Sequence, residues 1–152
     1  VSKPALYREF GNEDGLMSAV LSYYAEQVLS DIFAILAKDM PLQETLAAII
    51  QFASDEPRME TGCVFYKMRA GKHRLGPKTR AQVERIDASA VAAFTTFLES
   101  CRAKGDLANT VSATTAVRYL VEQIGLALTQ RAAGENPTQI RNTLELALVA
   151  LQ

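Results

Sequence analysis

The chain has 152 residues, enough for one domain to bury most of its apolar surface without disulfides or metals. Its formal net charge of −1 gives the whole chain no general attraction to nucleic acid or to an anionic membrane. Two cysteines lie far apart, Cys63 and Cys101, and His73 is the one histidine, so we expect no metal site, no cofactor and a reducing, cytoplasmic compartment.

The first sixteen residues predict a short helix followed at once by a long one. Ser2 is a good N-cap, and Gly11 after Phe10 is a typical stop for a helix. Asn12 then caps a second helix, whose first turn carries two acidic residues that favour a helix N-terminus. Such a short helix contributes little to a core, but it is well suited to presenting a few side chains at the surface.

Residues after Gly11 are predicted to be helical throughout, because apolar residues recur with a period close to 3.6 and no alternating pattern competes. A loop is expected at 55–60 and a turn at 71–76, and a strand stays open as an alternative for 61–70. The fold class is therefore all-α, with further helices expected over residues 12–38, 42–54, 61–70, 77–104, 112–133 and 137–151.

The segment V-S-K-P-A-L-Y-R-E-F-G-N-E-D-G-L resembles the recognition helix and the start of the next helix in TetR-family transcriptional repressors. The commoner family wording is T-x-x-L-Y-x-H-F-x-S-K-E-x-L. The resemblance implies that residues 1–38 are a remnant of a helix-turn-helix domain, with a recognition helix at about 2–10 and a connecting helix from about residue 12. Residues 39–152 would be a TetR-like helical ligand-binding and dimerisation domain. The first two helices of the family are expected to be missing, by truncation at the N-terminus.

By this resemblance, one face of the first helix would read DNA. Leu6 and Phe10 would face inward, whereas Glu9 and Glu13 replace a frequent His and a frequent phosphate-contacting Lys of the family. The simpler alternative is that residues 1–11 form only a helical cap. The DNA-binding residues that the resemblance implies are Ser2, Lys3, Pro4, Ala5, Tyr7 and Arg8.

The last two helices carry wide apolar bands, which favour an interface in addition to the core. In the alternative interpretation, both helices simply pack into the core of one protomer. TetR-family proteins dimerise through a four-helix bundle built from such a pair, so we expect a homodimer. The predicted interface residues are Val117, Val121, Ile124, Leu128, Ile140, Leu144, Leu148 and Leu151.

A small-molecule pocket is expected among the middle helices, because regulators with this resemblance bind an effector there. Gln123 is the most pointed candidate, since a buried amide requires a partner, although aromatic and Met residues at helical spacing are more often plain core. Cys63 is either a redox sensor or a buried filler. The predicted ligand-binding residues are Phe52, Phe65, Met68, Phe94, Phe97, Leu98, Tyr119, Gln123 and Leu126.

Residues 67–85 carry seven cations and one acidic residue, Glu84. Three interpretations apply: a solvated surface, a face toward DNA phosphates or the missing helices, or the basic mouth of a pocket for an acidic effector. No nucleophile–base set or Glu-x-x-His pair appears, so no catalytic residue and no enzymatic activity are predicted.

The sequence therefore predicts a ligand-responsive, DNA-binding transcriptional regulator, which we expect to be a repressor whose effector releases DNA. Its expected partners are operator DNA in the full-length protein, a small-molecule effector and a second copy of the chain, with no membrane. The alternative is a helical small-molecule-binding or protein-interaction domain with no DNA role.

Overall fold

The computed structural model describes residues 2–152, and every regular element in that range is helical, as the sequence predicts. The segment 61–70, where a strand was the alternative, contains a helix. The elements in chain order are α1 (Lys3–Phe10), α2 (Glu13–Tyr24), η1 (Ala25–Leu29), α3 (Ser30–Ala37), α4 (Leu42–Asp55), η2 (Pro57–Met59), α5 (Val64–Ala70), η3 (Lys72–Arg74), α6 (Pro77–Ala103), α7 (Ala113–Ala132), α8 (Pro137–Leu148) and η4 (Val149–Leu151).

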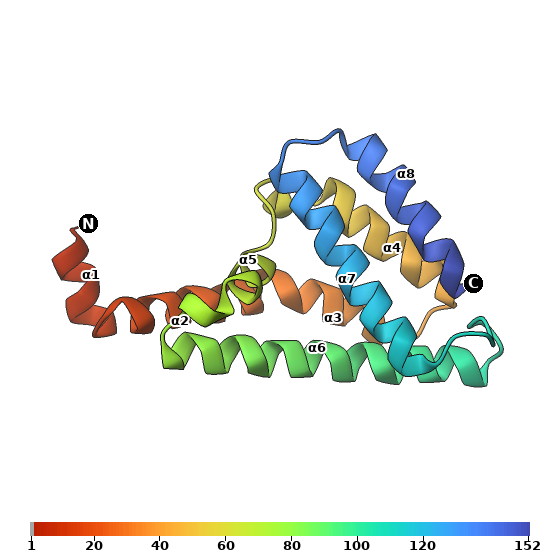
Figure 1. Ribbon diagram of the computed structural model, residues 1–152, viewed down its shortest axis with the longest axis horizontal. Helices are drawn as coiled ribbons and strands as arrows, with labels where there is room; N and C mark the ends of the chain where they lie inside the picture. The colour runs from red at the N-terminus through yellow and green to blue at the C-terminus, as the bar shows by residue number, and fades with distance from the viewer. Residues whose placement is uncertain (1) are drawn as a thin grey trace.

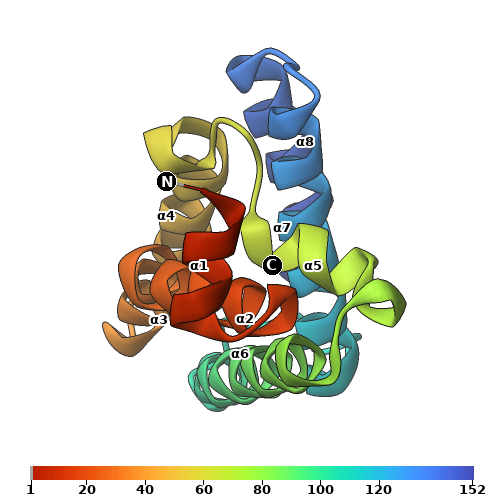
Figure 2. The same ribbon diagram turned by 90° about the vertical axis from the view of Figure 1, so that its left-hand side faces the viewer.

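The molecule is elongated, with α1 at one end and a bundle of helices at the other (Figure 1). Successive elements α2, η1 and α3 form one long rod that runs beside α6. At the bundle end, α4, α7 and α8 pack against one another, and α7 also contacts α6. Viewed from the α1 end, the short first helix lies in front of the rod, away from α8 (Figure 2).

Local signals in the sequence place most helix ends. The Asn12 side chain accepts a hydrogen bond from the Gly15 amide at 2.8 Å, and Asn136 accepts one from the Thr138 amide at 2.9 Å. Each of these bonds satisfies an amide that has no partner within its helix. Three glycines that end helices have the positive φ that favours glycine: Gly11 (87°), Gly105 (81°) and Gly134 (79°).

The predicted continuous helix over 12–38 contains a π-helical turn, η1. Its wider turn moves the carbonyls out of α-helical register, and such turns are frequent at functional sites. The whole run Glu13–Ala37 is long and apolar enough to cross a membrane by length and composition. Within it, Leu21, Val28 and Leu36 are buried against the body of the protein, and core helices pass the same test.

Candidate functional site

The short helix α1 projects the predicted DNA-reading residues from the end of the molecule. Lys3 and Arg8 are exposed, Tyr7 is half-buried, and the Lys3 Nζ lies 5.5 Å from the centre of the Tyr7 ring. The Ser2 hydroxyl accepts from the Ala5 amide at 3.3 Å, which is the predicted N-cap. The remaining predicted residue, Pro4, is exposed in the first turn.

No described residue of α1 is fully buried, so this helix is held less firmly than the others. Leu6 and Phe10, which were expected to face inward, are half-buried where α1 packs on α2. Gly15 permits this approach, because a Cβ there would lie 1.9 Å from the Phe10 carbonyl oxygen. The position of α1 therefore follows the position of α2.

Asp14, in the first turn of α2, caps the first turn of α6. The Lys78 amide donates to Oδ2 at 2.9 Å, while the Thr79 amide and hydroxyl donate to Oδ1 at 2.9 and 2.7 Å. These bonds, the one from the Thr79 hydroxyl first, hold the pKa of the Asp14 carboxyl below its usual value. Gly76 fits beside this carboxylate, since a Cβ at residue 76 would lie 2.4 Å from Asp14 Cγ.

The polar contact between α2 and α6 continues for two more turns. Ser18 donates to the Gln82 Oε1 at 2.7 Å, and the Gln82 Nε2 donates to the Ser22 hydroxyl at 2.5 Å. Asp14, Ser18 and Ser22 are spaced by four residues and so lie on one face of α2. Sequence reasoning treated Asp14 only as a charge at the N-terminus of its own helix. Its partners are more than 60 residues away, and no local pattern indicates them.

Beyond this polar section, the rod and α6 separate around an internal cavity of about 50 Å³. Its partly exposed lining residues, which mark the mouth, lie on the rod, α5 and α6. The lining residues are Leu29, Ile32, Phe33, Phe52, Met59, Cys63, Phe65, Tyr66, Ile86, Ala90, Phe94, Val121, Ile124 and Leu128.

The two ionisable groups in this lining are protonated and neutral near pH 7. Burial raises the pKa of the Cys63 thiol and of the Tyr66 hydroxyl. The Tyr66 hydroxyl donates to the Val121 carbonyl at 2.6 Å, so its proton is already used. The Cys63 sulfur lies 3.1 Å from the Tyr24 hydroxyl. A buried thiol with a raised pKa favours the filler interpretation of Cys63 over the sensor interpretation.

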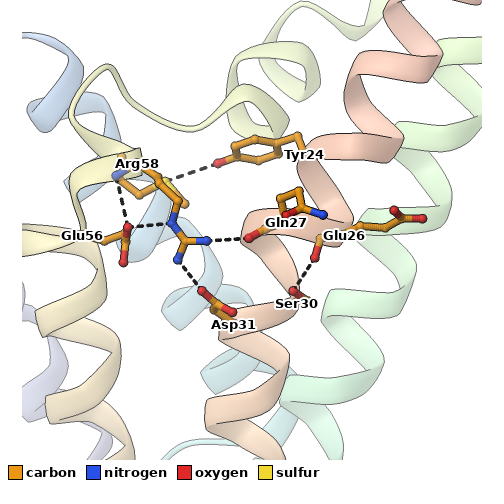
Figure 3. A network of polar contacts seen from close by, with 8 residues as sticks. Tyr24, Glu26, Gln27, Ser30, Asp31, Glu56 and Arg58 are labelled. Atoms are coloured by element: carbon orange, nitrogen blue, oxygen red, sulfur yellow. Dashed lines mark hydrogen bonds and ion pairs between the residues drawn. The ribbon is translucent and has the colours of Figure 1, made fainter.

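A polar network fastens the π-helical turn to the segment that follows α4 (Figure 3). Arg58 pairs with Asp31 on the rod and with Glu56 at 2.7 Å, and it donates to the Gln27 carbonyl at 2.5 Å. A donor at this carbonyl offsets the disturbed hydrogen bonding of a π-helical turn. Met59, next to Arg58, lines the cavity. The network therefore joins the segment that contains Met59, which lines one side of the cavity, to the rod, which lines another side.

The structure brings three of the predicted ligand-binding residues to this cavity, Phe52, Phe65 and Phe94. The other six lie elsewhere. Tyr119 donates to the Ala147 carbonyl at 2.6 Å and so links α7 to α8. The apolar period of α7 shows which residues face the core but not which of them border a cavity. The remaining five are Met68, Phe97 and Leu98 in the packed core, and Gln123 and Leu126 on the outer face of α7.

The eight predicted interface residues are all buried within one protomer. Val121, Ile124 and Leu128 line the cavity. A side chain already covered by its own chain contributes little to a subunit contact. On both α7 and α8, the stripe with the most apolar residues packs against the same protomer, and a stripe with fewer apolar residues remains exposed. The buried residues are Val117 (1% exposed), Val121 (5%), Ile124 (4%), Leu128 (3%), Ile140 (0%), Leu144 (3%), Leu148 (0%) and Leu151 (1%).

The outer face of α7 and α8 carries a mixed apolar and amide surface instead. Leu126 is 53% exposed and Leu146 is 75% exposed. A shallow hollow between the two helices is lined by Gln123, Leu126, Ala127, Gln130, Thr143 and Leu144. We call the surface formed by Gln123, Leu126, Gln130, Thr143 and Leu146 the outer face.

Two of the seven cations of the basic segment 67–85, Arg69 and Lys72, form ion pairs with acidic residues of the protein itself. Arg69 lies 3.2 Å from Asp87 and 2.7 Å from Glu122, and Lys72 lies 3.5 Å from Glu84. These pairs favour the solvated-surface interpretation. Arg74 borders the groove beside Asp14, at the end of the body nearer α1.

Within residues 2–152, no group of three or more His, Cys, Asp or Glu side chains comes together in a way that could hold a metal ion.

Part of the chain is similar to a protein named as a transcriptional repressor. It is 30% identical over 80 residues to the HTH-type transcriptional repressor BdcR of Escherichia coli (strain K12). The aligned region is 53% of this chain and 41% of that protein, so the chain matches less than half the length of its relative. No protein-family profile matches the chain, and no solved structure matches it.

Proposed function

We propose that this chain belongs to a TetR-like, ligand-responsive repressor, which binds operator DNA as a homodimer and releases it when a small molecule enters the cavity. The observation that carries the proposal is the single rod α2–η1–α3. One end of the rod supports α1, and Leu29, Ile32 and Phe33 near its other end line the cavity. A displacement at the cavity therefore reaches the reading helix through one continuous element. The proposed function involves binding and conformational change, with no catalytic step.

DNA binding is assigned to the exposed edge of α1. Lys3 and Arg8 supply positive charge, and Tyr7 supplies a hydroxyl that can donate to a phosphate or a base edge. The relative named as an HTH-type repressor supports this assignment. We expect the residues of this edge to be Ser2, Lys3, Pro4, Ala5, Tyr7 and Arg8.

Dimerisation is assigned to the outer face in place of the residues first predicted. Leu126 and Leu146 are exposed apolar side chains on two adjacent helices, and the amides beside them can pair across a two-fold axis. The helices α7 and α8 lie away from α1 (Figure 1), so the two reading helices would remain free to enter successive major grooves about 34–36 Å apart. An effector that changes this spacing would favour the DNA-free state by population shift.

The test of DNA binding uses the natural gene product that contains this chain. Duplexes are selected from a random DNA library by repeated binding, and affinities are measured in 150 mM salt. We expect Lys3→Ala and Tyr7→Phe to weaken binding by about tenfold or less each, as for the loss of one contact. Arg102→Ala, an exposed cation at the far end of α6, is the matched control. Unchanged affinity for both α1 variants would overturn the assignment.

The test of dimerisation is the mass of the protein by light scattering at micromolar concentration. We expect a dimer that Leu126→Glu or Leu146→Glu converts to a monomer, because each places a charge in the apolar contact. Val20→Glu, at an exposed apolar position on α2, should remain dimeric. A monomeric parent protein, or a dimer unaffected by both outer-face changes, would contradict the proposal.

A further inference from the structure

We propose that the cavity between the rod, α5, α6 and α7 binds a small, uncharged aromatic molecule of about one ring, and that it rejects charged analogues of the same size. This inference rests on the proposal that the cavity is the effector site, and it names the chemical class of the effector.

The first argument is the absence of charge among the residues that line the cavity. Every lining residue is apolar, apart from the Tyr66 hydroxyl and the Cys63 thiol. A carboxylate or ammonium that enters such a site loses its hydration and gains no counter-ion, at a cost that shifts or prevents binding. Arg69 on α5 is not free to pair with a ligand, because it is already paired with Asp87 and Glu122.

The second argument is that the strongest hydrogen-bond donor of the lining, the Tyr66 hydroxyl, is already used. Tyr66 donates its proton to the Val121 carbonyl, and its ring is held in place because Gly125 has no side chain. A Cβ at residue 125 would lie 2.6 Å from Cε1 of that ring. A ligand that accepts a hydrogen bond from the Tyr66 hydroxyl would therefore have to break the existing bond between Tyr66 and Val121.

The third argument concerns the type of apolar contact. Four phenylalanine rings line the cavity, Phe33, Phe52, Phe65 and Phe94, together with the sulfur of Met59. Aromatic rings prefer edge-to-face or offset contacts with other rings, and a thioether sulfur makes favourable contacts with ring edges. This lining favours an aromatic ligand over a saturated one of the same volume.

The fourth argument is size. The cavity measures about 50 Å³, whereas an engineered apolar cavity of about 150 Å³ accommodates benzene. One ring therefore requires the half-buried side chains at the mouth, such as Phe33 and Ile86, to move outward. Because Phe33 belongs to the rod, this movement acts on the element that carries α1.

The experiment compares toluene, benzoate, benzylammonium and methylcyclohexane as probes of the chain in the absence of DNA. Binding is measured by titration of the isoleucine methyl signals in NMR spectra and by the rise in melting temperature. We expect toluene to shift the methyl signals of Ile32, Ile86 and Ile124, and to bind about tenfold or more tightly than each other probe. No methyl shift with toluene at its solubility limit would overturn the inference. Equal or tighter binding of benzoate or benzylammonium would overturn the exclusion of charge, and equal binding of methylcyclohexane would overturn the aromatic preference.

A pair of variants locates the binding. Ala90 lines the cavity on α6, whereas Ala88 on the same helix is exposed. We expect Ala90→Leu to reduce toluene affinity by about tenfold or more by filling the cavity, and Ala88→Leu to leave it unchanged. Equal toluene affinity in both variants would overturn this location. If Ala90→Leu does not fold, the methyl shifts of the parent protein still decide the location. Toluene binding is measured without DNA, so toluene can bind even if α1 does not bind DNA, and α1 can bind DNA even if toluene does not bind the cavity. Failure of this inference and failure of the proposed DNA binding are therefore distinguishable.

Discussion

Different interactions hold the helices together at the two ends of this molecule. At the α1 end, the contacts that fix the orientation are hydrogen bonds, with Asp14 capping α6 and Gln82 linking Ser18 to Ser22. At the bundle end, α4, α7 and α8 pack through fully buried side chains such as Leu120 and Ile140. Hydrogen bonds are directional, whereas apolar burial scales with area. The comparison indicates that the bundle end provides stability and the α1 end provides orientation.

The strongest test of this comparison removes one leucine from each end. Leu120→Ala, at a position with 0% exposure, should lower the free energy of unfolding by about 2–5 kcal/mol. Leu6→Ala on the half-buried α1 should lower it by about 1 kcal/mol or less. The measurement is urea unfolding followed by circular dichroism. Equal losses of unfolding free energy in the two variants would contradict the conclusion that the bundle end provides the stability.

A second variant should separate orientation from stability. Gly15→Ala places a Cβ against the Phe10 carbonyl and should push α1 away from α2. We expect DNA affinity of the natural gene product to fall by about tenfold or more, with little change in melting temperature. Gly71→Ala is the control for the loss of a glycine, because residue 71 has a negative φ and a Cβ there would lie 3.8 Å from the Lys67 carbonyl oxygen, an ordinary contact distance. A large fall in melting temperature for Gly15→Ala alone would show that α1 is part of the stable core.

The cap on α6 predicts a dependence on pH. Because the folded-state pKa of Asp14 is lowered, its charged form stabilises the fold above its ordinary pKa of 3.8, and this contribution is lost as the pH falls through the folded-state value. We expect Asp14→Asn to lower the melting temperature at pH 7. The difference from the parent protein should shrink as the pH is lowered below about 4. Glu44→Gln, an exposed carboxylate in the first turn of α4, is the control. A difference that stays constant down to acidic pH would contradict the role of the charged cap.

The smallest expected effect concerns a buried hydroxyl at the bundle end. Ser54 is fully buried, and its Oγ has no hydrogen-bond partner in the described part of the chain. Replacing a buried, unpaired hydroxyl by a methyl group removes a desolvation cost, so Ser54→Ala should change stability by about 1 kcal/mol or less, in the stabilising direction. Urea unfolding measures the change. A loss above about 2 kcal/mol would mean that the hydroxyl has a partner.

The helices and most of their ends can be predicted from local sequence signals. Asn12, Asn136 and the glycines at 11, 105 and 134 act through bonds and torsion angles within a few residues of themselves, so their effects can be read locally. The first helix resembled a recognition helix for the same reason, since its cap, its stop and its exposed edge all lie within residues 2–11. The all-α class followed from the apolar period alone.

Which apolar stripe of a helix faces which neighbour depends on how the helices pack, and no local pattern predicts it. The periodicity of α7 identified Val121, Ile124 and Leu128 as apolar but could not assign them to a cavity wall in place of a subunit contact. Leu126 and Leu146, which remain outside, have the same side chain as the buried leucines. The partners of Asp14 and Arg58 were equally hidden, because contacts between residues far apart in sequence depend on how helices cross. Helix formation is a local event, and burial is a property of the whole packed chain.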